Sequence, residues 1–137
     1  MAVAVTVFWF VMSPRPRAFA QLIGLTAVIG FAWDSGVALL GLMRYAPGVI
    51  TPPLAPLWIL ALWILLATTL HLSMRWLQER LFVAAALGAI AAPLSYLAGA
   101  RLGALTLPQV EPALLVQAVG WAVLLPVLLR AARGLNV

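Results

Sequence analysis

Long apolar runs, separated by short polar stretches, dominate the pattern along this chain. A membrane-spanning helix needs about 20 consecutive, mostly apolar residues. Four runs have that length, and we predict spanning helices over residues 18–43, 56–76, 81–104 and 113–131. The pattern therefore predicts an all-α fold: a polytopic membrane helix bundle that forms a single domain over residues 1–137.

A fifth apolar run, over residues 2–12, is too short to cross a membrane alone. A secretory signal peptide starts with basic residues and ends at a small-residue cleavage site. This run has no basic start, and the stretch from Ser13 to Arg17 (Ser-Pro-Arg-Pro-Arg) is a poor cleavage sequence. We therefore favour a short, partly inserted N-terminal helix over a signal peptide.

Composition supports a lipid environment and excludes several kinds of site. Hydrophobic residues make up 66% of the chain and charged residues 8%, whereas a soluble domain carries about 25% charged residues. The absence of cysteine excludes disulfides and thiolate metal sites, and one histidine cannot build a multi-histidine centre. We predict no metal and no cofactor.

The net charge of +5 comes from arginines dispersed along the chain. Such dispersal suits contact with anionic lipid better than a nucleic-acid groove. We therefore expect the lipid bilayer, and other membrane proteins or a second copy of the chain, as partners, and no nucleic acid.

The arginines also predict the orientation, because cytoplasmic loops are enriched in basic residues. Loops 13–17 and 75–80 and the C-terminus fall on one side of the predicted bundle. That side carries six arginines, and the other carries only Arg44 and Arg101. The count predicts a cytoplasmic C-terminus in a bacterial inner (plasma) membrane.

Small residues recur at helical spacing in two of the predicted spans. Close backbone approach over such residues drives helix association in lipid. The first stripe consists of Ala27, Gly30, Asp34, Ala38 and Gly41, and the second of Ala84, Gly88, Ala92, Ser95 and Gly99. We expect both stripes to pack against neighbouring helices.

Asp34 is the most informative residue, because it lies about 25 Å from the cytoplasmic end of its helix, inside the hydrocarbon. An ionised carboxylate there costs at least about 2.5–3.5 kcal/mol. It must therefore face protein, find a partner or stay protonated. Two interpretations remain open: a proton, substrate or catalytic site, or a structural carboxyl that hydrogen-bonds a neighbouring helix or caps a helix break at Asp34-Ser35-Gly36.

Candidate partners lie at a similar predicted depth. Tyr96 and Gln117 are about 23 Å and about 20 Å from the same surface, and Ser35 is adjacent in sequence. We predict a polar cluster of Asp34, Ser35, Tyr96 and Gln117. Arg101 is a secondary candidate counter-ion, but its helical phase and interfacial position favour Tyr96 as the partner.

His71 lies about 19 Å in depth from Asp34, which excludes a His–Asp dyad and a Ser-His-Asp system within one chain. Thr68 shares its helix face and is a candidate hydrogen-bond partner. We favour an interfacial or core histidine over a catalytic one. This separation between His71 and Asp34 makes an enzyme less favoured than a protein without catalytic activity.

Several segments resemble a known family. These segments are Trp33-Asp34-Ser35, the run from Pro56 through Trp63 to His71, Trp76, the run from Gly88 to Ala104, and Gly120-Trp121 with Leu125-Pro126. They resemble the bacterial inner-membrane family known as domain of unknown function 2878, from about Ala18 onward. The resemblance implies a further helix upstream of the position of Ala2, a link to membrane lipid metabolism, and no established catalytic residue.

The sequence therefore leaves three classes of function. A structural or accessory bundle subunit is favoured by the small-residue stripes and the shortage of polar residues. A lipid-linked transporter, or a membrane lipid-modifying protein, would use the polar cluster around Asp34. We favour the accessory subunit and keep the lipid-handling protein as the alternative.

Overall fold

The computed structural model describes residues 2–46 and 54–136, and these residues form five helices with a small two-stranded sheet. The elements in chain order are α1 (Ala2–Met12), α2 (Pro16–Leu39), β1 (Arg44–Tyr45), α3 (Leu57–Leu72), the 3-10 turn η1 (Arg75–Leu77), α4 (Leu81–Arg101), β2 (Leu105–Thr106) and α5 (Val110–Gly134). Apart from the two short strands, the fold is helical, as the apolar runs predict.

Three helices, α2, α4 and α5, are long and apolar enough to cross a membrane. They correspond to the predicted spans 18–43, 81–104 and 113–131, with ends shifted by up to four residues. The fourth predicted span, 56–76, is divided: α3 has 16 residues, and η1 follows it. The three long helices are those of a membrane protein, whereas α1 and α3 are apolar but shorter.

Polar residues explain why α3 ends early. Thr68 and Thr69 both donate their hydroxyls back to the Leu65 carbonyl, a contact that weakens helical continuity. The buried side chain of Gln78 then donates to the Leu70 carbonyl at 3.4 Å, which supplies one of the partners that a helix end needs. Hydropathy does not detect either contact, so it extends the helix too far.

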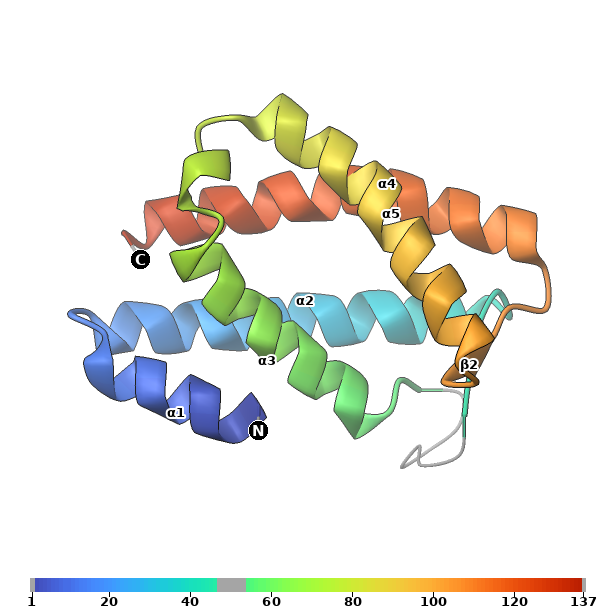
Figure 1. The fold of residues 1–137 in the computed structure, drawn as a ribbon, viewed down its shortest axis with the longest axis horizontal. Coiled ribbons are helices and arrows are strands. Elements are labelled where there is room, and N and C mark those ends of the chain that lie inside the picture. Colours follow the sequence, from blue (N-terminus) through green and yellow to red (C-terminus); the bar gives the residue numbers. More distant parts are fainter. Residues whose placement is uncertain (1, 47–53, 137) are drawn as a thin grey trace.

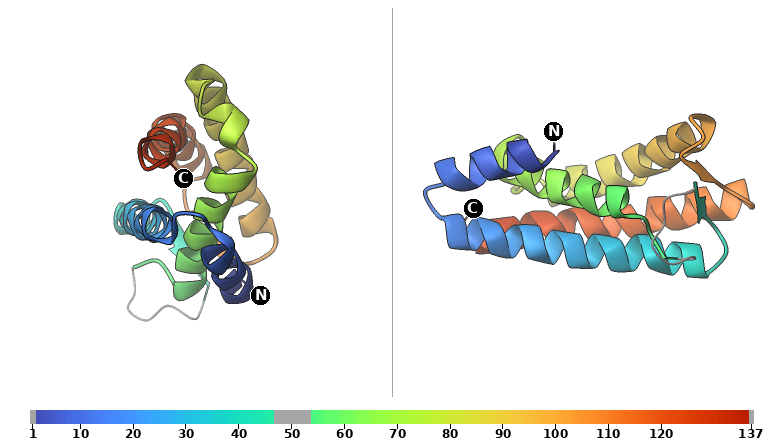
Figure 2. Two further views of the ribbon diagram at one scale, coloured as in Figure 1. Left: turned by 90° about the vertical axis from the view of Figure 1, so that its left-hand side faces the viewer. Right: turned by 90° about the horizontal axis from the view of Figure 1, so that it is seen from below.

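The helices form two hairpins, and the views agree on their arrangement (Figures 1 and 2). α3 packs on α2, α5 packs on α4, and α1 lies against α3. α3 and α4 cross obliquely over α2 and α5 in Figure 1. The loops with most arginines gather at the end that holds the C-terminus, and the two strands lie at the opposite end.

The two hairpins share a local pattern that ends their first helices. Gly41 after α2 and Gly103 after α4 both adopt positive φ, at 72° and 78°. In each case the backbone N–H of the next residue donates to the carbonyl five residues back, Leu42 to Val37 and Ala104 to Gly99, as in a Schellman motif. A two-residue strand follows each glycine, beginning three residues after Gly41 and two residues after Gly103.

The strands pair antiparallel, with Arg44 opposite Thr106. These two residues are 62 positions apart, the same separation as between Gly41 and Gly103. An antiparallel pair that joins equivalent positions places the two segments about a local twofold axis. The chain therefore contains two related helix–glycine–strand–helix units, which the apolar pattern alone does not reveal.

Both small-residue stripes are used inside the chain. Gly30 of α2 lies directly against the Trp63 ring of α3, and Gly88 of α4 lies against the backbone carbonyl of Trp121 in α5. A side chain at either glycine would overlap its neighbour, so these contacts require glycine. At Gly30 and Gly88 each stripe packs on the next helix in its own hairpin.

Candidate functional site

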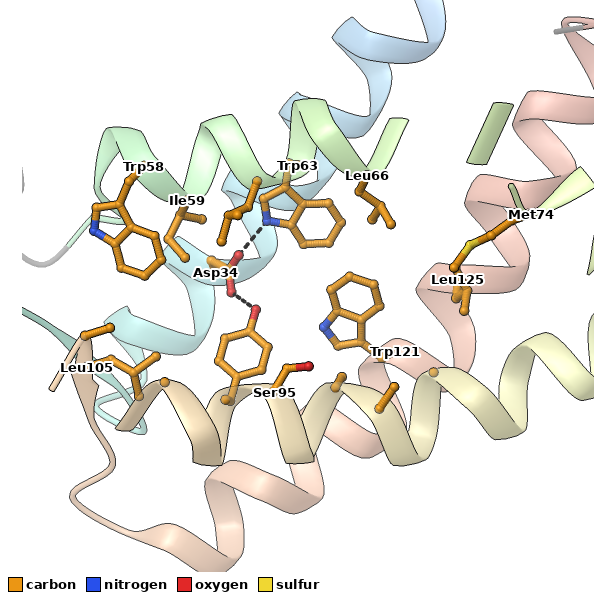
Figure 3. Close-up of a pocket in the computed structure, with 17 residues that line it drawn as sticks. Asp34, Trp58, Ile59, Trp63, Leu66, Met74, Ser95, Leu105, Trp121 and Leu125 are labelled. Carbon is orange, nitrogen blue, oxygen red and sulfur yellow. Dashed lines mark hydrogen bonds between the residues drawn. The ribbon is translucent and has the colours of Figure 1, made fainter. Parts of the chain in front are cut away.

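Asp34 is fully buried and accepts two side-chain hydrogen bonds from two other helices. The Tyr96 hydroxyl donates to Oδ1 at 2.5 Å, and the Trp63 indole Nε1 donates to Oδ2 at 2.6 Å (Figure 3). The carboxyl therefore links α2, α3 and α4 at one level of the bundle. That level lies about 8 Å from the strand end of α2.

The Asp34–Tyr96 contact joins equivalent positions of the two related units, because these residues are also 62 positions apart. Asp34 precedes Gly41, and Tyr96 precedes Gly103, by the same number of residues. The hydrogen bond therefore crosses the local twofold axis. One hairpin supplies the acceptor of this bond, Asp34, and the other supplies the donor, Tyr96.

Tryptophans form the wall beside this carboxyl. Trp63 stacks on Trp121 of α5 with ring centroids 4.8 Å apart and an interplanar angle of 15°. The Trp121 Nε1 is buried beside the Tyr96 hydroxyl, but within the described residues it makes no well-aligned hydrogen bond. Figure 3 shows this nitrogen on the side of its ring that faces Asp34. A buried donor without an acceptor is costly, and it marks a place where a ligand oxygen can bind.

The other members of the predicted cluster have different partners. Gln117 is buried, and its Oε1 accepts from the Trp33 indole at 3.0 Å, so it lies beside the Asp34 network without bonding to it. The Ser35 hydroxyl accepts from the Ala55 backbone N–H at 3.1 Å and fixes the start of α3. Adjacent residues on a helix point about 100° apart, so Ser35 cannot share the direction of Asp34.

The secondary candidates lie outside this network. Arg101 is exposed where α4 ends, and the described residues contain no ion pair between it and Asp34. His71 packs on Phe19 at the opposite end of α3, with ring centroids 5.3 Å apart. Thr68 donates to the Leu65 carbonyl. The structure thus brings Asp34 and Tyr96 together and keeps His71 at the other end of the bundle.

A pocket of about 410 Å³ lies between the two hairpins, and Asp34 forms part of its inner wall. Apolar side chains from α3, α4 and α5 make up most of the lining, as Figure 3 shows. Its mouth is formed by exposed residues in the middle of α3 and α4, among them Leu62, Ala91 and Ser95. Because these positions lie along the helices rather than at their ends, the mouth opens on the side of the bundle.

Hydrogen-bonding capacity at the inner wall is only partly used. A carboxylate has about four acceptor sites; Tyr96 and Trp63 occupy two of them, and the Tyr45 hydroxyl also interacts with the Asp34 carboxyl. The buried Trp121 N–H lies nearby, beside the Tyr96 hydroxyl, and makes no well-aligned hydrogen bond within the described residues. A hydroxyl or amine group could therefore donate to Asp34, and a hydroxyl could also accept from Trp121. Because Asp34 itself has no exposed surface, such a group must first displace the Tyr96 hydroxyl or the Trp63 indole.

Sequence reasoning did not identify Trp63, Trp121 or Trp33 as members of the site. A signal was nevertheless present, because an indole N–H within hydrocarbon requires an acceptor. Trp63 lies eight residues before His71, so its depth is about 12 Å greater, which leaves it about 7 Å from the level of Asp34 and within reach of its long side chain. Among the described residues, no group of three or more His, Cys, Asp or Glu side chains could hold a metal ion.

The fold and the site define a class: a small helical membrane protein with an apolar lateral pocket and a hydrogen-bonded carboxyl in its wall. The chain belongs to the family described as "Protein of unknown function (DUF2878)", whose family model matches residues 1–127. The match confirms the resemblance noted from the sequence and extends it to residue 1. No curated protein and no solved structure matches the chain.

Proposed function

We propose that this protein binds a membrane amphiphile in its lateral pocket, with the apolar part between α3 and α4 and the polar group near Asp34. The observation that carries the proposal is the buried Asp34 carboxyl in the wall of a pocket of about 410 Å³. Small-molecule pockets typically have about 300–1,000 Å³ and combine apolar walls with a few polar groups. An intramembrane acid in such a wall is a candidate contact for substrate.

The position of the mouth supports a ligand that arrives from the bilayer. If α2, α4 and α5 cross the membrane, the middle of α4 lies within the hydrocarbon, and so do Ala91 and Ser95 at the mouth. A lipid chain can then enter sideways without crossing water. The polar group that fits best is a hydroxyl, because it can both donate to the carboxyl and accept from Trp121.

This proposal favours the lipid-handling class over the accessory subunit. The small-residue stripes supported a subunit, yet Gly30 and Gly88 make their close contacts inside the chain. These two contacts explain the glycines without a partner protein. We retain an inner-membrane location with a cytoplasmic C-terminus as part of the proposal, on the basis of the arginine distribution.

Filling the mouth of the pocket should remove the bound amphiphile. Ala91 and Ile90 are neighbours on α4 and both are exposed, but only Ala91 lines the pocket. We expect Ala91→Phe to lower the amount of co-purified amphiphile at least roughly fivefold, because the ring occupies its space, whereas Ile90→Phe should leave it unchanged. Native mass spectrometry of the detergent-purified protein, followed by lipid analysis, measures both.

Two outcomes would contradict the proposal. One is a wild-type protein that carries no amphiphile after gentle extraction. The other is an equal loss of co-purified amphiphile in the Ala91→Phe and Ile90→Phe variants. Because both positions are exposed, thermal unfolding should show that neither variant disrupts the bundle. A stable, ligand-free protein that associates with itself or another membrane protein would instead favour the structural subunit.

A further inference from the structure

A second pocket lies at the other end of the bundle, far from Asp34, and has a different chemical character. It has about 600 Å³ and lies where the α1–α2 turn, the end of α3 with η1, and the end of α5 meet. The lining residues are Met12, Ser13, Pro14, Arg15, His71, Leu72, Arg75, Gln78, Arg133 and Asn136. No aspartate or glutamate is among them.

Three separate segments of the chain each contribute one arginine to this pocket. Arg15 comes from the α1–α2 turn, Arg75 from η1 and Arg133 from the last turn of α5. The described residues contain no ion pair that would neutralise any of the three. Like charges that converge without a counter-ion repel one another, and an anion between them would remove that cost.

Arg133 alone would not indicate a ligand, because a cation in the last turn of a helix interacts favourably with the helix dipole. Arg15 and Arg75 have no such contact with a helix C-terminus, since Arg15 precedes a helix N-terminus and Arg75 belongs to a short 3-10 turn, and a cytoplasmic loop position does not require them to line one pocket. Arg15 is also held in place, because its guanidinium donates to the Asn136 carbonyl at 3.3 Å. This contact brings the turn and the C-terminal segment together around the pocket.

We propose that this second pocket binds a phosphate group. Guanidinium groups bind phosphate oxygens through paired N–H donors, and three of them from different directions can surround one tetrahedral anion. Ser13 and Gln78 add polar side chains, and Met12 and Leu72 provide an apolar edge. The shared chemistry is a phosphate with at least one negative charge, carried either by a lipid headgroup or by a free anion.

Matched arginine variants test this proposal on the full chain in a zwitterionic detergent. Arg15→Gln with Arg75→Gln removes two charges from the pocket. Arg17→Gln with Arg130→Gln removes two charges from exposed arginines that do not line it. Native mass spectrometry and thermal shift then measure the binding of phosphatidylglycerol, phosphatidylcholine and inorganic phosphate to each variant and to the wild type.

We expect the pocket variant to bind phosphatidylglycerol roughly tenfold more weakly than the wild type, with little change in the control variant. Binding of phosphatidylglycerol without inorganic phosphate identifies a lipid headgroup as the source. Binding of inorganic phosphate as well identifies a free anion as a second source. The proposal is overturned if neither ligand binds the wild type, or if the two double variants weaken binding equally, since equal loss indicates only diffuse attraction.

Discussion

Substitution of Gly30 by alanine should lower the free energy of unfolding by about 2–4 kcal/mol. A Cβ at this position would overlap the ring of Trp63, which packs directly against the glycine. The indole must then move, and it loses both its bond to Asp34 and its stack on Trp121. Denaturant titration in detergent micelles, followed by far-UV circular dichroism, measures the change.

Gly24 provides the matched control on the same helix. A Cβ there would meet nothing within 4 Å, so Gly24→Ala should be neutral or slightly stabilising, because alanine favours a helix over glycine by about 1 kcal/mol. Equal stability of the two variants would show that Trp63 can move at little cost. The close packing seen at Gly30 would then not be needed for the site.

Removal of the Asp34 carboxyl should have a comparable effect. In Asp34→Ala the Tyr96 hydroxyl and the Trp63 indole lose their acceptors, and each unsatisfied buried donor costs about 1–3 kcal/mol. We expect a loss of about 2–4 kcal/mol in unfolding free energy. Asp34→Asn keeps one acceptor oxygen and should lose less. The same denaturant titration compares the two variants.

A double-mutant cycle with Trp63→Phe separates this hydrogen bond from other effects. Phenylalanine removes the indole donor. In the Trp63→Phe background, Asp34→Ala should therefore lower the unfolding free energy by about 0.5–3 kcal/mol less than it does in the wild type. Strict additivity would contradict a stabilising Asp34–Trp63 bond. If Asp34→Asn instead raises the unfolding free energy, the wild-type carboxyl destabilises the fold, which is common for groups that serve a function.

Much of the fold could be predicted from the apolar pattern, because lipid requires long helices whose backbone groups are satisfied internally. The pattern located α1, α2, α4 and α5. It failed at α3, where the end is determined by Thr68, Thr69 and Gln78 rather than by hydropathy. The two-residue strands at Arg44 and Leu105 are too short to give an alternating pattern.

The candidate site was predictable only in part. Depth along the helices placed Asp34 and Tyr96 at one level, and the structure shows a hydrogen bond between them. Depth alone could not determine rotation, so Ser35 and Gln117 were grouped with them although they bond to Ala55 and Trp33. Trp63 was missed because tryptophan in a membrane helix is more often an interfacial anchor than a donor to a buried acid.

The relation between the two units has a further consequence for the acid. If two identical hairpins associated about the same axis, the residue opposite Asp34 would be another aspartate, and two carboxyls would repel each other in hydrocarbon. Fusion of both units in one chain removes that constraint, because the positions can change independently. One unit carries an acid and the other a phenol. Asymmetry between covalently joined halves thus allows a single buried carboxyl to lie where the two hairpins meet.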